Sequence, residues 1–240
     1  MLKLDILVLP VHPDDAELGC AGTLLKHIAL GKKVGIVDLT RGELGTRGSA
    51  EIRDKEAAAS SKILGLAVRE NLGLPDGFFE NSKEHQLKVI GAIRKYQPKI
   101  LITTAYYDRH PDHGRANELV ETSAFLSGLR KIETHFNGQL QDAWRPELVL
   151  HFIQDEYIKP DILIDVTEHW DKKVESINAF GSQFFNPNWE NEPQTYISSP
   201  EFIQVIEARA REFGKVINVK YAEGFTCRKI LGVDNLFNLL

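Results

Sequence analysis

Residues 8–27, VLPVHPDDAELGCAGTLLKH, contain an apolar run that ends at a histidine, followed by a proline and two adjacent aspartates. The apolar residues after the aspartates recur at helical spacing, and Gly31 then stops the pattern. The stretch therefore predicts a buried strand, a turn, and a helix that starts near Asp14 or Asp15. A single aspartate is common at a helix N-cap, but two in succession after His12-Pro13 favour a polar site at the end of the strand.

The same alternation of short apolar runs and amphipathic helical patterns extends along the chain. Continuous apolar strands are typical of parallel sheets covered on both faces, and right-handed crossovers make such a sheet Rossmann-like. We therefore expect an α/β fold, with a Rossmann-like, mostly parallel sheet and helices on both faces, in a single domain over residues 1–240. Ligands of such sheets bind beyond the carboxyl ends of the strands, where His12 lies. The predicted strands are residues 4–11, 34–39, 66–74, 100–104, 148–153 and 162–166, and the predicted helices include residues 51–64, residues 115–126 and one capped by Ser199-Pro200.

The composition argues against several classes of protein. The 240 residues carry a net charge of -5, from 29 Lys and Arg against 34 Asp and Glu, without a basic block, so nothing supports nucleic-acid binding. No apolar stretch approaches ~20 residues, so no membrane span is expected. The N-terminus lacks the features of a signal peptide, and two cysteines do not suggest a disulfide framework. A cytoplasmic location is the simplest expectation.

A second stretch, residues 106–117 (YYDRHPDHGRAN), repeats the pattern of the first. It follows a predicted strand, contains His110 and His113 three residues apart, and leads into a helix. If the two strands are neighbours, both stretches face one crevice. His12, Asp15 and His113 would then supply two imidazoles and one carboxylate, a donor set that suits Zn²⁺ and also Fe²⁺, with positions left open for water and substrate.

Three polar residues of these stretches remain outside the predicted ligand set: Asp14, His110 and Asp112. Each can take a role in metal-assisted amide hydrolysis. A bound metal lowers the pKa of its water, and Asp14 can take the proton as general base while that water attacks the amide carbonyl. A protonated His110 can stabilise the oxyanion or protonate the leaving amine. Asp112 would then orient His110 and keep it charged.

The motifs HPDD followed by AELGCAG, and HPDH further on, resemble those of the LmbE-like (PIG-L) family of zinc-dependent N-acetylglucosamine deacetylases. DLTRGELGTRGSAEIRDKEA, NLGLPDG, YYDRHPDHGRA, AFGSQF and AREFGKVINVKYAEGF are similar to the branch of bacillithiol biosynthesis, which removes acetate from N-acetylglucosaminyl-malate. The resemblance implies the same zinc ligands, the same base at Asp14, and His110 with Asp112 as the charge-stabilising pair. It also implies a small-molecule sugar substrate and a homo-oligomer, specifically a hexamer.

Two arginines are candidates for substrate binding. Arg53 starts a helix beside the glycine-rich loop of residues 41–49, where the resemblance implies a sugar or carboxylate contact, and a surface ion pair is the alternative. Arg109 precedes His110 and is a second candidate for the malate end. Some relatives carry a tyrosine where this chain has Asp108, and Tyr106, Tyr107 or Tyr196 are open replacements. The irregular residues 184–199 suggest a lid or an interface.

Several other functions stay open at this point. The substrate can be another N-acetylglucosaminide, linked to inositol, lipid or an antibiotic. The same donor set occurs in mononuclear Fe²⁺ oxygenases, although these are usually β-rich and would leave Asp14 and His110 without tasks. A sugar- or nucleotide-binding module with a structural metal is a further alternative. It is disfavoured because no G-x-G-x-x-G follows the first strand and because structural zinc sites normally have four protein ligands.

Overall fold

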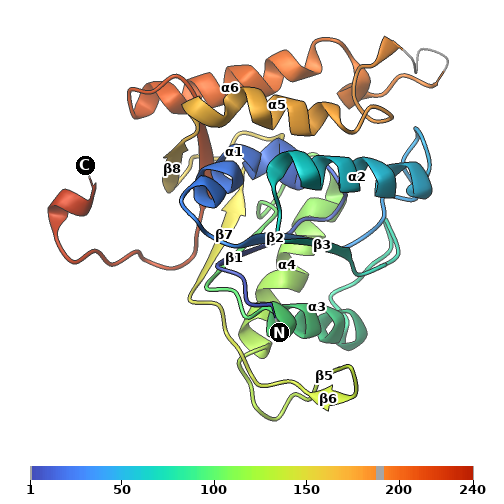
Figure 1. Cartoon of the computed structure of the whole chain (residues 1–240), viewed down its shortest axis with the longest axis vertical. Helices are drawn as coiled ribbons and strands as arrows, with labels where there is room; N and C mark the ends of the chain where they lie inside the picture. The colour runs from blue at the N-terminus through green and yellow to red at the C-terminus, as the bar shows by residue number, and fades with distance from the viewer. Residues whose placement is uncertain (1, 188–191, 240) are drawn as a thin grey trace.

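The computed structural model describes residues 2–187 and 192–239. Within these residues a seven-stranded sheet has the order β3-β2-β1-β4-β7-β9-β8, with helices against both faces (Figure 1). This arrangement confirms the predicted fold class. Five strands run parallel to one another: β1 (Ile6–Leu9), β2 (Val34–Asp38), β3 (Val68–Asn71), β4 (Ile100–Thr103) and β7 (Leu148–Phe152).

At several helix ends the local residue explains why the helix begins or ends there. Ser49 caps the second helix by accepting a hydrogen bond from the Ile52 N–H, and Gly65 ends that helix in the left-handed conformation. The fourth helix begins at Pro111, earlier than predicted, because proline fits the first turn. The helices are α1 (Asp15–Ala29), α2 (Ala50–Leu64), α3 (Lys83–Tyr96), α4 (Pro111–Leu126), α5 (Trp170–Asn178) and α6 (Phe202–Val216).

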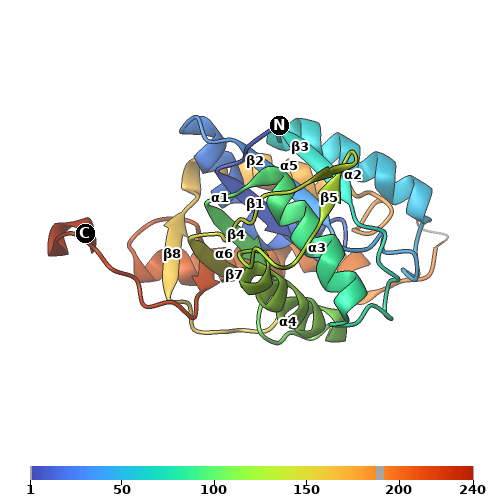
Figure 2. The same cartoon turned by 90° about the horizontal axis from the view of Figure 1, so that it is seen from below.

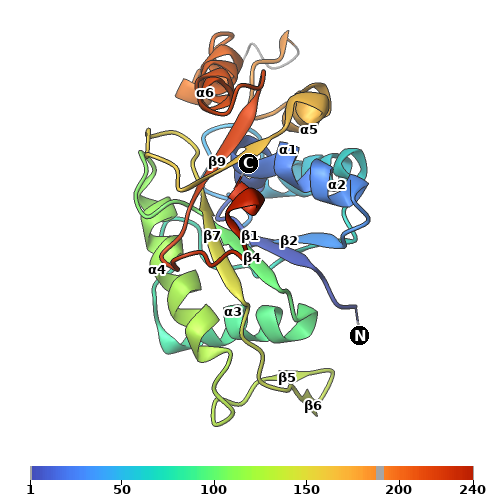
Figure 3. The ribbon, with the colours of Figure 1, turned by 90° about the vertical axis from the view of Figure 1, so that its left-hand side faces the viewer.

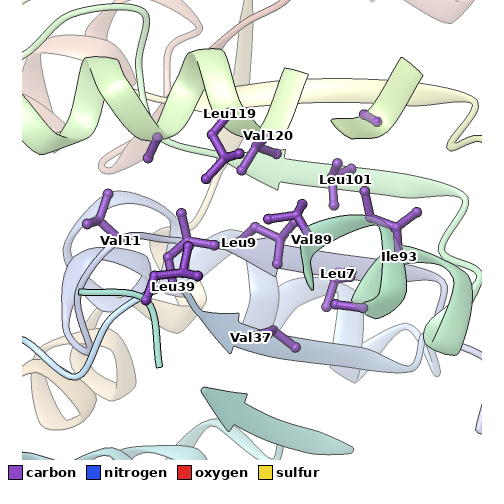
Figure 4. Packing of buried hydrophobic residues seen from close by; sticks show 14 of the residues in the cluster. Leu7, Leu9, Val11, Val37, Leu39, Val89, Ile93, Leu101, Leu119 and Val120 are labelled. Atoms are coloured by element: carbon purple, nitrogen blue, oxygen red, sulfur yellow. The ribbon is translucent and has the colours of Figure 1, made fainter. Parts of the chain in front are cut away.

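Alternate residues of the parallel strands point to opposite faces of the sheet and form two separate cores. Leu7 and Leu9 of β1 pack with Leu101 of β4 against α3 and α4, as Figure 4 shows for this core. Ile6 and Val8 point to the other face, where α1 covers them. Each of these side chains is at most 2% exposed, so the strands are fixed from both sides and hold the loops that leave their ends.

The last part of the chain departs from the predicted parallel pattern. β8 (Ile162–Asp165) lies at the sheet edge, and β9 (Ala222–Thr226), which was not predicted, runs antiparallel between β7 and β8. A small separate hairpin, β5 (His135–Phe136) with β6 (Gln139–Leu140), was also not predicted. The expected N-cap at Ser199 is wrong: Ser199 follows the 3-10 helix η3 (Tyr196–Ser198), and α6 starts at Phe202 after Glu201.

A third layer lies outside α1 and α2. α5 packs against both of these helices, and α6 packs on β9, so that the two C-terminal helices form the upper part of the molecule (Figures 1 and 3). The chain then leaves β9 as an arm that extends from the body and ends in the 3-10 helix η4 (Leu236–Leu239; Figure 2). A further 3-10 helix, η1 (Thr167–His169), precedes α5. None of the described helices is long and apolar enough to cross a membrane.

Candidate metal centre

The structure brings the two His/Asp stretches together at one edge of the sheet. β1 and β4 are hydrogen-bonded parallel neighbours with Leu9 opposite Thr103, so the segments that follow them emerge side by side. The ring centroids of His12 and His110 are 4.9 Å apart, and those of His12 and His113 are 5.9 Å apart. The crevice expected from the sequence is therefore present, with both segments in it.

His12, Asp15 and His113 offer one ligand atom each, and these atoms all lie within 4.8 Å of one another. Asp15 Oδ2 is 3.4 Å from Nδ1 of His12, and Asp15 Oδ1 is 3.3 Å from Nε2 of His113. The three side chains are buried, and their two nitrogens and one carboxylate fit a divalent Zn²⁺ or Fe²⁺ ion with open positions. His12, His110 and Asp112 form a second such group among the described residues.

Carboxylates lie behind both imidazoles of the first group. Nε2 of His12 is 3.0 Å from Asp76 Oδ1, and Nδ1 of His113 is 2.7 Å from Asp108 Oδ2. An ionised carboxylate only accepts hydrogen bonds, so each contact places the ring N–H on the outer nitrogen and leaves the inner nitrogen for a metal. The sequence analysis missed both carboxylates. Asp76 stands in a plain Pro-Asp-Gly turn, whereas the spacing of Asp108 from His113 was a usable signal.

The central carboxylate, Asp15, is held from several sides. The backbone N–H of His12 donates to its Oδ2 at 2.8 Å, and the Gln154 side-chain amide donates to its Oδ1 at 2.8 Å. Burial acts to raise the pKa of Asp15, but the neighbouring His113 and His12 outweigh it and hold that pKa well below its usual range. Asp15 is therefore ionised and oriented, as a metal ligand requires.

Asp14 precedes α1 but is not a conventional helix cap. Its φ is 143°, in a region that residues other than glycine rarely adopt, and its side chain makes no capping hydrogen bond within the described part of the chain. Its Oδ2 lies 3.3 Å from a guanidinium nitrogen of Arg53 instead. Burial raises the pKa of Asp14 to about 7, although the Arg53 charge acts to lower it. A buried carboxylate titrating near neutrality is suited to general base chemistry.

His110 lies in the pocket as expected, but its link to Asp112 differs from the predicted one. The backbone N–H of Asp112 donates to Nδ1 of His110 at 3.3 Å, whereas the Asp112 carboxylate accepts from the Gly77 N–H and from Arg115. Burial, with His12 and His113 nearby, lowers the pKa of His110. The predicted orienting contact from the Asp112 carboxylate is therefore replaced by one from its backbone N–H, and because Nδ1 of His110 accepts that bond, Nε2 is the nitrogen that carries a proton and can donate it.

Arg53 is buried, which corrects the alternative of a surface ion pair. Its guanidinium bonds Asp14 and, at 2.6 Å, the side-chain oxygen of Gln183, and its Nε has no hydrogen-bond partner among the described residues. The left-handed φ of Gly42 lets the loop pass directly over Arg53, where a Cβ would lie 1.7 Å from the guanidinium. Arg53 thus borders the pocket and also contacts Asp14.

A pocket of about 390 Å³ opens over these residues. Arg109 and Tyr196 stand at its rim, and Tyr196 is the tyrosine of the three candidates that lines it. Tyr106 packs against the ring of buried His151 instead. Thr195, Tyr196 and Ile197 bring part of the irregular segment 184–199 to the pocket wall, whereas residues 188–191 of that segment lie outside the described residues.

The arrangement can support hydrolysis of a polarised carbonyl. It combines a donor set for one divalent ion, a carboxylate that titrates near neutrality, and an imidazole that presents an N–H to the same pocket. These are the parts needed to activate a water, stabilise a developing oxyanion and protonate a leaving group.

Comparison with known proteins gives information that is independent of this geometry. The model of the family PIG-L, described as GlcNAc-PI de-N-acetylase, matches residues 7–124, which contain both His/Asp stretches. The solved structure of the conserved protein TT1542 from Thermus thermophilus is 36% identical. The match has a TM-score of 0.85 and covers 97% of this chain and 98% of that chain.

Curated relatives have several different names. A diacetylchitobiose deacetylase of Thermococcus kodakarensis is 27% identical over 91% of this chain and 81% of its own length. A probable N-acetyl-alpha-D-glucosaminyl L-malate deacetylase 2 of Bacillus anthracis is 27% identical over 75% of this chain and 81% of its own length. A 4-oxalmesaconate hydratase of Pseudomonas putida is 25% identical over 91% of this chain and 86% of its own length.

Proposed function

The chain belongs to the PIG-L family of de-N-acetylases, and on that premise we propose that it removes the acetyl group from N-acetylglucosaminyl-malate, a step of bacillithiol biosynthesis. The matching family model is described as a GlcNAc-PI de-N-acetylase, and the relative from Thermococcus kodakarensis is a diacetylchitobiose deacetylase. The malate part of the proposal is supported by the branch-like sequence segments and by the relative from Bacillus anthracis.

One observation carries the proposed chemistry: Asp14 lies next to the ligand set without belonging to it. Its side chain is 4% exposed and its only bonded charge partner among the described residues is Arg53. When bound to His12, Asp15 and His113, a Zn²⁺ ion would supply Lewis acidity, which polarises a carbonyl oxygen and makes water more acidic. Asp14 then takes a proton from the water that attacks the amide carbon.

The remaining residues handle the charge and the leaving group. Nε2–H of His110 donates toward the carbonyl oxygen as negative charge develops there, which lowers the barrier because the donor is already in place. The proton on Asp14 can pass to the departing nitrogen, so that glucosaminyl-malate leaves as the free amine, while the second proton of the water leaves on the released acetic acid, which ionises to acetate in solution. Asp112 acts through its backbone N–H, which fixes the tautomer of His110.

The binding of the substrate rests on the pocket rim. Arg109 lies at the opening, where a malate carboxylate attached to the sugar would reach it, and a guanidinium fork suits a carboxylate. Arg53 is deeper and already bonded to Gln183 and Asp14, so we assign it to the sugar and to the base rather than to malate.

An acetate-release assay with metal content measured on the same sample tests the proposal. We expect N-acetylglucosaminyl-malate to react faster than free N-acetylglucosamine, diacetylchitobiose and an inositol N-acetylglucosaminide, with about one zinc per chain. Equal rates on all four would overturn the malate assignment and leave the deacetylase chemistry. Absence of acetate release from every one, with metal bound, would favour a binding module or a hydratase.

A further inference from the structure

The pocket-rim residue Arg109 is not a free cation. Its Nε forms an ion pair with Asp155 Oδ2, and its guanidinium lies over the Tyr196 ring, 4.8 Å from the centroid. The Tyr196 hydroxyl donates to the other Asp155 oxygen at 3.1 Å. Asp155 therefore holds both rim residues and cancels the charge of Arg109 at the place where an aglycone would enter.

Hydrogen bonds to the backbone fix the segment that carries Asp155. It follows β7, and Arg209 of α6 donates to the carbonyl oxygens of Gln154, Asp155 and Glu156. The N–H of Glu156 donates to Asp108, the carboxylate behind His113, at 2.8 Å. The backbone of the segment is thus fixed from two sides, and the Asp155 side chain that faces Arg109 is 18% exposed.

A carboxylate on the aglycone must compete with Asp155 for the guanidinium. Asp155 bonds Nε of Arg109, so an anionic aglycone either displaces Asp155 or binds the other N–H groups of a guanidinium whose charge is already neutralised. A neutral aglycone meets no such competition. The ion pair therefore reduces the advantage that Arg109 gives to anionic substrates.

We propose that Asp155 is a specificity-determining residue that sets the charge preference of the aglycone end of the pocket by neutralising Arg109. The inference rests on the proposed deacetylase function, because Asp155 and Arg109 are assigned to the part of that site which binds the aglycone. Removing the charge of Asp155 makes Arg109 available and shifts the enzyme toward anionic aglycones. Removing the charge of Arg109 shifts it the other way.

Asp155→Asn is the test variant, because asparagine keeps the size and an acceptor oxygen but loses the charge. Glu156→Gln is the matched control: it removes the same charge one residue away, from an exposed side chain. Each protein is assayed with N-acetylglucosaminyl-malate and with the neutral methyl N-acetylglucosaminide. The affinities of the deacetylated products, glucosaminyl-malate and methyl glucosaminide, are measured by calorimetry.

We expect Asp155→Asn to raise the malate-to-methyl ratio of kcat/KM about 3- to 10-fold, chiefly through KM, and to raise the product affinity ratio similarly. The gain should shrink in high salt, since the rim is partly exposed. Glu156→Gln should leave both ratios unchanged, and Arg109→Gln should lower them. Unchanged or lowered ratios in Asp155→Asn would overturn the inference. Without any acetate release the deacetylase proposal fails, and the product affinities alone decide the role of Asp155.

Discussion

Asp108 Oδ2 lies 2.7 Å from Nδ1 of His113, while Nε2 of the same ring lies 3.3 Å from Asp15 Oδ1. One imidazole is thus held between an outer carboxylate and an inner one. Asp108 accepts two further bonds, from the backbone N–H groups of Arg109 and Glu156, so it is itself fixed. The ring of His113 is oriented before any metal binds, with its Nε2 directed at the ligand set.

The contact between Asp108 and His113 leads to a prediction about metal affinity. Asp108→Ala removes the acceptor behind His113, so we expect zinc to bind about 10- to 100-fold more weakly in competition with a chelator. Asp108→Asn keeps an acceptor oxygen and should lose less. Asp142→Ala, which removes an exposed carboxylate, is the control. Equal zinc affinity in the Asp108→Ala and Asp142→Ala variants would show that Asp108 does not support the site.

A substitution of Asp14 should affect catalysis without affecting metal binding. Asp14→Ala removes the proposed base but none of the three ligands, so acetate release should fall by about 10²-fold or more while zinc content stays near that of the natural sequence. Metal analysis and kcat are measured on one preparation. Activity that survives the change would remove Asp14 as base, and loss of zinc would place it among the ligands instead.

The sequence was sufficient to predict which two segments meet at the candidate centre because the information there is local. Continuous apolar runs define β1 and β4; His12 lies in the turn after β1 and His113 in the first turn of α4, the helix after β4, so the parallel fold brings both to one edge. The unusual backbone of Asp14 was not predictable, since a φ of 143° depends on what the surrounding structure imposes. The same limit applies to Asp76, which reaches His12 from 64 residues away.

The C-terminal part was harder to predict because its strand lacks the usual signal. β9 has the sequence AEGFT, and its Glu223 is buried because Lys173 pairs with it at 2.6 Å and two N–H groups of α1 donate to it. A buried charge satisfied by distant partners cannot be recognised from periodicity. The antiparallel direction of β9 likewise follows from its return after α6, a connection that no short motif marks.

Glu121 gives a prediction about pH. It accepts a hydrogen bond from the buried His151 at 2.7 Å, and this bond holds the pKa of Glu121 below its ordinary value of 4.5. Because the folded pKa is lowered, the ionised carboxylate stabilises the fold fully above pH 4.5, and this contribution is lost as the pH falls through the lowered value. Glu121→Gln should therefore reduce the free energy of unfolding by about 1–2 kcal/mol at pH 7, and by less at acid pH.

Urea unfolding at several pH values between 3.5 and 7 measures this effect. Glu118→Gln, an exposed residue of the same helix, is the control and should change stability little at any pH. A deficit of Glu121→Gln that is the same at pH 3.5 and pH 7 would contradict a contribution from the ionised carboxylate.

Metal binding should also be visible in thermal unfolding. A ligand that binds only the folded state stabilises it, by about 2.7 kcal/mol when its free concentration is 100 times its Kd. For a chain of this size such a gain corresponds to a rise in Tm of roughly 5–10 °C. Each protein is first stripped of metal with a chelator. We then expect added zinc to raise the Tm of the natural sequence and of Asp14→Ala, but not of His113→Ala. A full shift in His113→Ala would place the ion elsewhere.

Gly19 links the packing of α1 to the centre at its N-terminus. A Cβ at Gly19 would lie 2.3 Å from the Phe152 ring of β7, so the helix can approach the sheet only with glycine there. Alanine is the better helix former by about 1 kcal/mol, but overpacking a fixed core costs about 1–3 kcal/mol. Gly19→Ala should therefore lower the free energy of unfolding and, because Asp15 lies one turn away on α1, also weaken zinc binding.

Gly91 in α3 is the matched control, since a Cβ there would have its nearest neighbour 3.8 Å away. Gly91→Ala should raise the free energy of unfolding by about 0.5–1 kcal/mol and leave zinc affinity unchanged. Both variants are compared by urea unfolding and chelator competition. If Gly19→Ala proved as stable as Gly91→Ala, the close contact with Phe152 would not fix the position of α1. If it lost stability but kept its zinc affinity, the position of Asp15 would not depend on how this helix packs.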